Sequence, residues 1–127
     1  MKELTKAEEQ VMQIIWELNK GFVNDIIAQL PEPKPAYNTV STVVRILEKK
    51  GFVSHRAYGK TYEYFPVVSR KDYTKSYFGT FMNNYFGNSY QQLVTFFSKN
   101  GNLSLNDLED IKSLMEQEIE KQKNSKP

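Results

Sequence analysis

The sequence predicts a mainly α-helical fold with one small β-hairpin. Apolar residues recur at helical spacing in three successive segments before residue 51, and again after residue 69. Between these stretches lie two short runs rich in aromatic and β-branched residues, separated by a glycine turn. The order helix, helix, helix, hairpin is typical of a winged helix-turn-helix. We therefore expect a winged helix over residues 1–68 and a helical region over residues 69–127.

The first helix is expected to begin at Thr5, because Thr5 and Glu8 have the spacing of a capping box. We expect Gly21 to end it. The second helix is expected to be short: apolar residues at i, i+3, i+4 and i+7 start at Val23 and are followed by prolines, which lack amide donors, at Pro31, Pro33 and Pro35.

The third helix is expected to start at Ala36 or Tyr37, to run to Lys50 and to stop at Gly51. One face of this helix is apolar, so we expect that face to be buried in the core. The other face carries a polar stripe, with small side chains at its start and basic ones towards its end, which comprises Asn38, Ser41, Thr42, Arg45 and Lys49.

A hairpin is expected next, with strands at residues 52–55 and 62–65. Gly59 can supply the positive φ that a tight turn requires. The predicted loop, residues 56–60, carries side chains suited to phosphate or minor-groove contact, namely Arg56, Tyr58 and Lys60. Lys34 and Lys50 are expected to flank this site.

Charge is distributed unevenly along the 127 residues, although the net charge is only +2. Residues 31–75 hold 9 basic and 4 acidic side chains, whereas the residues on either side are net acidic. One cationic face on a nearly neutral body is typical of a nucleic-acid-binding protein. Because a DNA major groove admits one α-helix, we expect the polar stripe of the third helix to face base edges.

Four members of this stripe keep an alternative interpretation. Ser41 and Thr42 also fit plain solvent-facing positions, and only their place on the same stripe as Arg45 favours DNA contact. Asn38 suits base contact and helix capping equally, since it lies where the helix begins. Lys49, close to the end of the helix, also fits simple compensation of the helix dipole.

Other classes of function have little support in the sequence. There is no cysteine and only one histidine, His55, which cannot form a metal cluster by itself and, on a predicted strand, gives no basis for a Ser-His-Asp set. We expect no enzyme activity, no cofactor and no metal, and a neutral His55 facing solvent or groove. The N-terminus does not have the pattern of a signal peptide, so a cytoplasmic location is expected. The alternative function is a winged-helix protein-interaction module without sequence-specific DNA binding.

Three helices are expected after residue 69, separated by breaks at residues 87–89 and 100–102, and residues 123–127 are expected to fray. They carry more apolar surface than a small monomeric region can bury, which indicates a homodimer that places two reading helices on successive turns of DNA. A small-ligand pocket in this aromatic region is a lesser alternative. The residues expected to mediate dimerisation are Tyr73, Tyr77, Phe81, Tyr85, Leu93, Phe97, Leu108, Ile111, Leu114 and Met115.

The sequence resembles the penicillinase-repressor family, the BlaI/MecI/CopY regulators, over almost its whole length. The resemblance is carried by residues 5–12 (TKAEEQVM) with the Ile-Trp pair at 15–16, by residues 38–53 (NTVSTVVRILEKKGFV) and by residues 62–66 (YEYFP). It implies a dimeric winged-helix repressor of inverted-repeat operators. In that family the start of the recognition helix corresponds to Asn38, Thr39, Ser41 and Thr42.

The resemblance also implies a mode of regulation. Family members are often paired with a membrane sensor metalloprotease, and the signal ends with cleavage in the dimerisation region, which corresponds here to residues 93–97. The beta-lactam-responsive members typically have Asn-Phe where this chain has Phe96 and Phe97, so the resemblance implies cleavage of the Phe96–Phe97 bond, with a different residue before the bond. The copper-responsive branch uses cysteines near its C-terminus, which this chain lacks.

Overall fold

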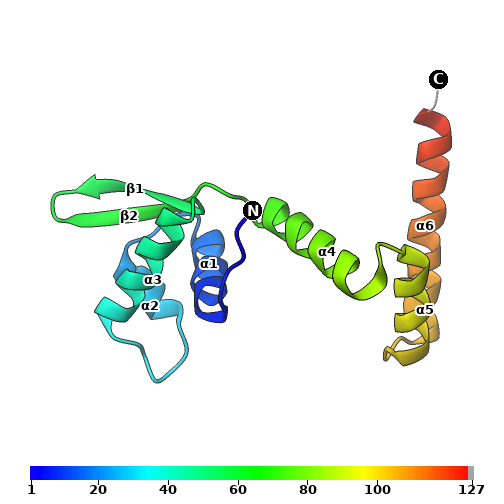
Figure 1. The fold of residues 1–127 in the computed structure, drawn as a ribbon, viewed down its shortest axis with the longest axis horizontal. Coiled ribbons are helices and arrows are strands. Elements are labelled where there is room, and N and C mark those ends of the chain that lie inside the picture. The colour runs from blue at the N-terminus through cyan, green and yellow to red at the C-terminus, as the bar shows by residue number, and fades with distance from the viewer. Residues whose placement is uncertain (126–127) are drawn as a thin grey trace. The chain divides into compact units, whose positions relative to one another are not determined.

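The computed structural model describes residues 1–125 and divides into two compact units, Met1–Thr80 and Phe81–Pro127 (Figure 1). The predicted fold class is confirmed: the fold is a winged helix followed by a helical region. The boundary between the units falls inside the fourth helix, so the first unit contains the winged helix and the start of that helix. The elements in order are α1 (Lys6–Leu18), α2 (Val23–Gln29), α3 (Tyr37–Lys49), β1 (Val53–Tyr58), β2 (Thr61–Pro66), α4 (Arg70–Phe86), α5 (Tyr90–Asn100) and α6 (Leu105–Ser125).

The predicted capping box at the start of α1 is confirmed. The Thr5 hydroxyl accepts a hydrogen bond from the Glu8 amide at 3.2 Å, and the Thr5 amide donates to Glu8 Oε1 at 3.1 Å. The predicted stop at Gly21 is wrong, because α1 ends at Leu18 and the C-cap residue Asn19 takes a positive φ of 68°. Asparagine tolerates a positive φ better than most residues do, which frees Gly21 for another role.

Gly21 extends the β-sheet instead of capping a helix. Its amide and carbonyl both bond to Tyr64 of β2, at 2.9 and 2.8 Å. A Cβ at Gly21 would lie 3.3 Å from the Leu18 side chain, so the position has little room for a larger residue. The turn between α1 and α2 is thereby held against the β1–β2 hairpin, which we call the wing.

The wing is longer than predicted. β1 continues to Tyr58 and β2 begins at Thr61, so the turn contains only Gly59 and Lys60. Gly59 has φ +63°, as a tight two-residue hairpin turn requires. Arg56, expected in the loop, therefore lies within β1 and pairs in register with Glu63.

The start of α4 is anchored to the winged helix. The Trp16 indole nitrogen donates to the Val68 carbonyl at 2.8 Å, and the Arg70 guanidinium lies over the Trp16 ring. Tyr73, one turn further along, packs against the rings of Trp16 and Phe52 and is only 8% exposed. Tyr73 thus belongs to the core of the first unit, and little of its side chain is left for contact with a second copy.

A buried carboxylate connects the start of α1 to the end of α3. Glu8 is 6% exposed, and its Oε1 lies 2.5 Å from Lys50 Nζ, which also donates to the Glu3 carbonyl. Burial raises the pKa of Glu8, but hydrogen bonds from Lys50 and Thr5 and the charge of Lys50 outweigh it and hold the pKa below its ordinary value. Lys50, expected beside the DNA site, is therefore engaged in the core.

Loss of this ion pair is expected to destabilise the fold. Lys50→Met should lower the free energy of unfolding at pH 7 by about 1–3 kcal/mol, because Glu8 stays buried without its partner. The neighbouring variant Lys49→Met, at an exposed position, is the matched control and should change little. Urea titrations of both variants and the wild type measure the difference.

The same pair predicts the direction of a pH effect. Because the folded-state pKa of Glu8 lies below its ordinary value of 4.5, its stabilisation is complete above that value. It is lost as the pH falls through the folded-state pKa. The gap in unfolding free energy between the wild type and Lys50→Met should therefore narrow under acid conditions, and a gap that is equal at all pH values would contradict this assignment.

The second unit, residues 81–127, has little core of its own. Gly87 and Asn88, with φ 55° and 63°, break the helix at the predicted place, and Ser104 and Asp107 cap α6 reciprocally. Met82 is the one buried side chain among the described residues of this unit, while α5 and α6 contain none. The predicted fraying from residue 123 is wrong as far as α6 extends, to Ser125, and the last two residues of that tail lie outside the described part. No helix in the described chain is long and apolar enough to cross a membrane.

Candidate nucleic-acid interface

The start of α3 is not capped by a side chain. The N-cap residue is Ala36, and the Asn38 side chain lies inside the first turn of the helix, where it is exposed. The capping interpretation of Asn38 is therefore wrong, because the chain enters the helix two residues earlier. An exposed amide at this position can donate and accept hydrogen bonds, as a base edge requires.

The polar stripe of α3 is arranged by bonds within the helix itself. The Thr42 hydroxyl donates to the Asn38 carbonyl at 2.8 Å. The Arg45 guanidinium lies back along the same face, donating to the Ser41 carbonyl and to Thr42 Oγ1, both at 3.3 Å. These exposed contacts are long, so Arg45 can exchange them for a ligand at small cost. Lys49 continues the stripe and is exposed.

A hollow of about 250 Å³ separates α3 from the wing, and we call it the helix–wing notch. It brings together three residues predicted for DNA binding, Ser41, Arg45 and Lys60, which come from α3 and from the hairpin turn. Two cations and a hydroxyl around one hollow suit an anionic group such as a phosphate. Its remaining lining residues are Val23, Tyr37, Tyr62 and Tyr64.

His55 does not simply face solvent or groove. Its Nδ1 lies 2.6 Å from Glu48 Oε2 on α3, and its ring stacks on Tyr62 at 4.1 Å with 12° between the planes. Tyr64 lies on the same face of the wing, 5.8 Å from His55. Burial raises the pKa of Tyr64, and the charge of Glu48 adds to the shift. From the sequence, the alternation of side chains along strands could have predicted that His55 shares a face with the two tyrosines. Its contact with Glu48 on α3 is a tertiary contact, which the sequence pattern does not predict.

Arg56 and Tyr58 do not join the helix–wing notch. Side chains alternate between the two faces of a strand, so these residues lie on the face opposite to His55. The Tyr58 ring packs 5.8 Å from Phe22, and Arg56 lines a separate hollow with Lys20. The predicted wing residues thus divide between two surfaces, of which only the Lys60 side belongs to the notch.

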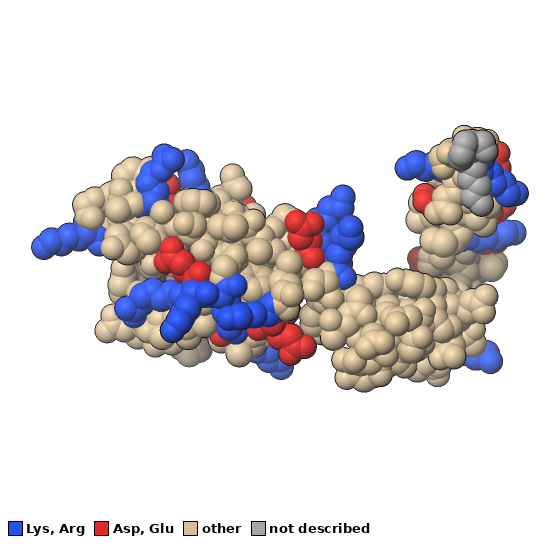
Figure 2. All heavy atoms as spheres, turned by 45° about the horizontal axis from the view of Figure 1, so that its top comes forward, with Lys and Arg blue, Asp and Glu red and all other residues tan. Residues whose placement is uncertain are grey.

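Two other predicted residues lie away from the notch. Thr39 lines an apolar hollow beside the proline-rich loop together with Val40 and Val43. Lys34 donates to the carbonyls of Ala28 and Leu30 at the end of α2, so it acts as a helix C-cap. Lys and Arg side chains nonetheless project from several places on this unit (Figure 2). Among residues 1–125, no group of His, Cys, Asp and Glu side chains could hold a metal ion.

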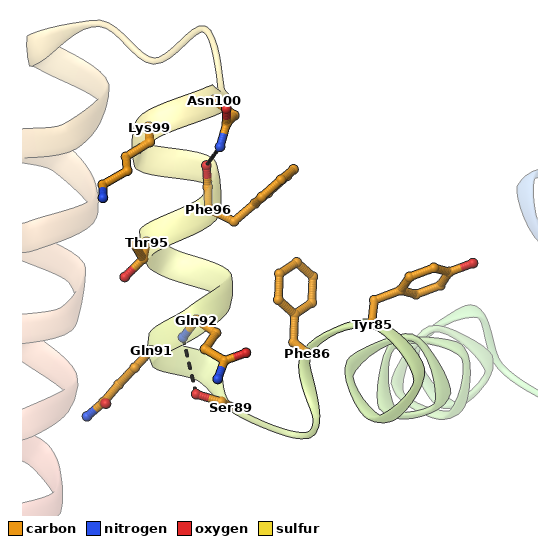
Figure 3. A pocket seen from close by; sticks show the side chains of 9 residues that line it. All are labelled: Tyr85, Phe86, Ser89, Gln91, Gln92, Thr95, Phe96, Lys99 and Asn100. Carbon is orange, nitrogen blue, oxygen red and sulfur yellow. Dashed lines mark hydrogen bonds between the residues drawn. The ribbon is translucent and has the colours of Figure 1, made fainter.

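The second unit exposes a large apolar surface. Leu93 and Phe97 on α5 and Ile111 on α6 are half-buried. Beside α5 lies an open cavity of about 610 Å³, where the Phe86 ring lies 5.8 Å from that of Phe96 and the Tyr85 ring points away from both (Figure 3). Apolar residues that are more than a third exposed continue this surface along the helices: Tyr85, Tyr90, Val94, Phe96, Leu105, Leu108, Leu114, Met115 and Ile119.

The sequence profile of the penicillinase repressor family matches residues 4–117. The chain belongs to this family. Its relatives include the methicillin resistance regulatory protein MecI of Staphylococcus aureus strain N315, 27% identical over 89% of this chain and 93% of MecI. The penicillinase repressor of Bacillus licheniformis is 25% identical over 95% of both chains. This penicillinase-repressor family member is accordingly a transcriptional repressor.

The fold also resembles that of a solved structure with low sequence identity to this chain. A solved complex structure of hsRosR-S4 matches 93% of this chain and 91% of that chain, with a TM-score of 0.54 and 16% sequence identity. At that identity the match concerns the fold alone. It extends through the winged helix and the helices that follow.

Proposed function

We propose that this penicillinase-repressor family member binds inverted-repeat operator DNA as a homodimer, with α3 in the major groove and the wing beside it. The observation that carries the proposal is the exposed stripe of Asn38, Thr42 and Arg45, which ends beside the cationic helix–wing notch. Small polar side chains at the start of the stripe allow α3 to approach base edges closely. Arg45 and Lys60 supply charge where the DNA backbone passes.

The proposed dimer rests on the second unit. α6 runs for 21 residues without a buried side chain, and Leu114 and Met115 are 59% and 56% exposed. Apolar patches of this extent on small proteins mark interaction surfaces. A second copy of the same unit would cover them, and a two-fold axis would present two α3 helices to the two halves of a palindrome. Tyr77, Phe81, Tyr85, Leu93, Phe97, Leu108, Ile111, Leu114 and Met115 remain the candidates, without Tyr73.

Operator binding is tested by protection mapping on the DNA upstream of the protein's own gene. We expect a protected palindrome and an affinity that falls steeply with added salt, by about 0.9 logarithmic units per phosphate contact for each tenfold rise in salt. A folded protein that is not retained on DNA at low salt would instead favour a protein-interaction module.

We also propose that repression ends by proteolysis in α5, after a signal from a membrane sensor metalloprotease. Phe96 is 56% exposed, but the Phe96–Phe97 bond lies inside a hydrogen-bonded helix, so a protease needs α5 to open locally. Immunoblots of induced cells should show a fragment ending near Phe96, and Phe96→Ala, which is compatible with the helix, should reduce it. An intact chain during full derepression would rule this route out.

A further inference from the structure

His55 connects the wing to the recognition helix through two contacts. Its Nδ1 lies 2.6 Å from Glu48 Oε2, one turn beyond Arg45 on α3, and its ring stacks flat on Tyr62 of β2. His55 and Glu48 are both half-buried, with about a third of each side chain exposed. A charge-assisted contact at this depth is shielded from water more than one on the open surface.

The same contacts shape the helix–wing notch. Tyr62 and Tyr64 form the wing side of the notch, and His55 lies against both rings. Arg45 and Ser41 form the helix side, and Lys60 stands at the hairpin turn. A two-stranded hairpin is by itself marginally stable, so its orientation depends on such tertiary contacts.

We propose that His55 is a positioning residue for DNA binding: through Glu48 it holds the wing at the distance from α3 at which Lys60 and Arg45 can contact the same stretch of DNA backbone. This inference rests on the proposed operator binding. His55 itself touches no DNA. Because His55 affects DNA affinity by positioning Lys60, its effect should depend on Lys60 being present. A general loss of stability would not depend on Lys60.

A double-mutant cycle tests the proposal. We expect His55→Ala to lower operator affinity about fivefold, equivalent to about 1 kcal/mol, with a nearly unchanged thermal unfolding midpoint. In a Lys60→Ala background the same change should cost less than about twofold, because the wing cation that His55 positions is gone. In a Lys49→Ala background, at an exposed position of α3 outside the notch, the full fivefold loss should persist.

Side-chain replacements separate the Glu48 contact from the ring stack. His55→Gln keeps a donor for Glu48 and should recover part of the affinity, whereas His55→Phe keeps the stack and should behave like His55→Ala. Glu48→Ala should lower operator affinity as much as His55→Ala does, and the double variant should lose no more than either single variant. Glu48→Ala also tests the contact if the His55 variants do not fold. Equal losses in the Lys60→Ala and Lys49→Ala backgrounds, or wild-type affinity for His55→Phe, would overturn the proposal. If the wild type itself fails to bind the promoter fragment, the proposed function fails first.

Discussion

Met115→Glu is expected to convert the proposed dimer into a monomer. Met115 is 56% exposed in the single chain and lies on the apolar stripe of α6 with Leu108 and Ile119. A carboxylate placed in the proposed interface would have to be desolvated without a partner, which is strongly unfavourable. Analytical ultracentrifugation at micromolar concentration should show the mass of one chain, with the helix content preserved.

Operator affinity should fall with the loss of the dimer. Two linked reading helices bind more tightly than one through their effective concentration, so the monomer should bind about 100-fold more weakly or worse. Ser113→Glu introduces the same charge on the opposite, polar side of α6 and should leave both mass and affinity unchanged. A Met115→Glu protein that remains dimeric would move the interface to another surface.

Arg45→Ala is expected to cause the largest loss of DNA affinity of any single change in the winged helix. A hydrogen bond to a charged group such as a backbone phosphate contributes about 1.5–3 kcal/mol, and a symmetric dimer loses two such contacts. Arg45 is exposed and its bonds lie within its own helix, so the unfolding free energy should change by less than about 0.5 kcal/mol. Fluorescence anisotropy with the mapped operator and with a scrambled duplex measures the effect.

Comparison of the two duplexes separates base contact from general charge. Because Arg45 is proposed to contact the backbone, the losses on the two duplexes should be similar, and a larger loss on the operator would assign Arg45 a base contact instead. Lys121→Ala removes one positive charge from α6, outside the winged helix, and serves as the control for net charge. Unchanged operator binding by Arg45→Ala would count against the assignment of this face of α3.

Local patterns in the sequence predicted local structure well. The capping box of Thr5 and Glu8 needs only residues three apart, and the break at Gly87 needs only backbone preference. Element order followed from periodicity in the same way. The exact helix ends were harder to predict where several nearby residues could form them. α1 ends with Asn19 as its C-cap and not at Gly21, and the N-cap of α3 is Ala36 and not Asn38.

Tertiary contacts explain most of what the sequence did not predict in the candidate site. Lys50 was expected to flank the DNA site, yet its partner Glu8 is 42 residues away. The link from His55 to Glu48 depends on the fold bringing β1 beside α3. Likewise Arg56 left the predicted surface once the hairpin turn proved to be two residues long, because strand alternation then set its side.

The anchoring of α4 bears on how a repressor of this design can be switched off. Trp16, Val68 and Tyr73 join the first turns of α4 to the winged helix, so the smallest independently folding piece should end beyond Tyr73 and not at residue 68. A cut in α5 leaves every one of these contacts intact. The product would be a folded winged helix that is no longer joined to a second copy. The signal would then reduce the number of linked DNA-binding units and the time that the repressor stays on DNA, without unfolding the DNA-binding unit.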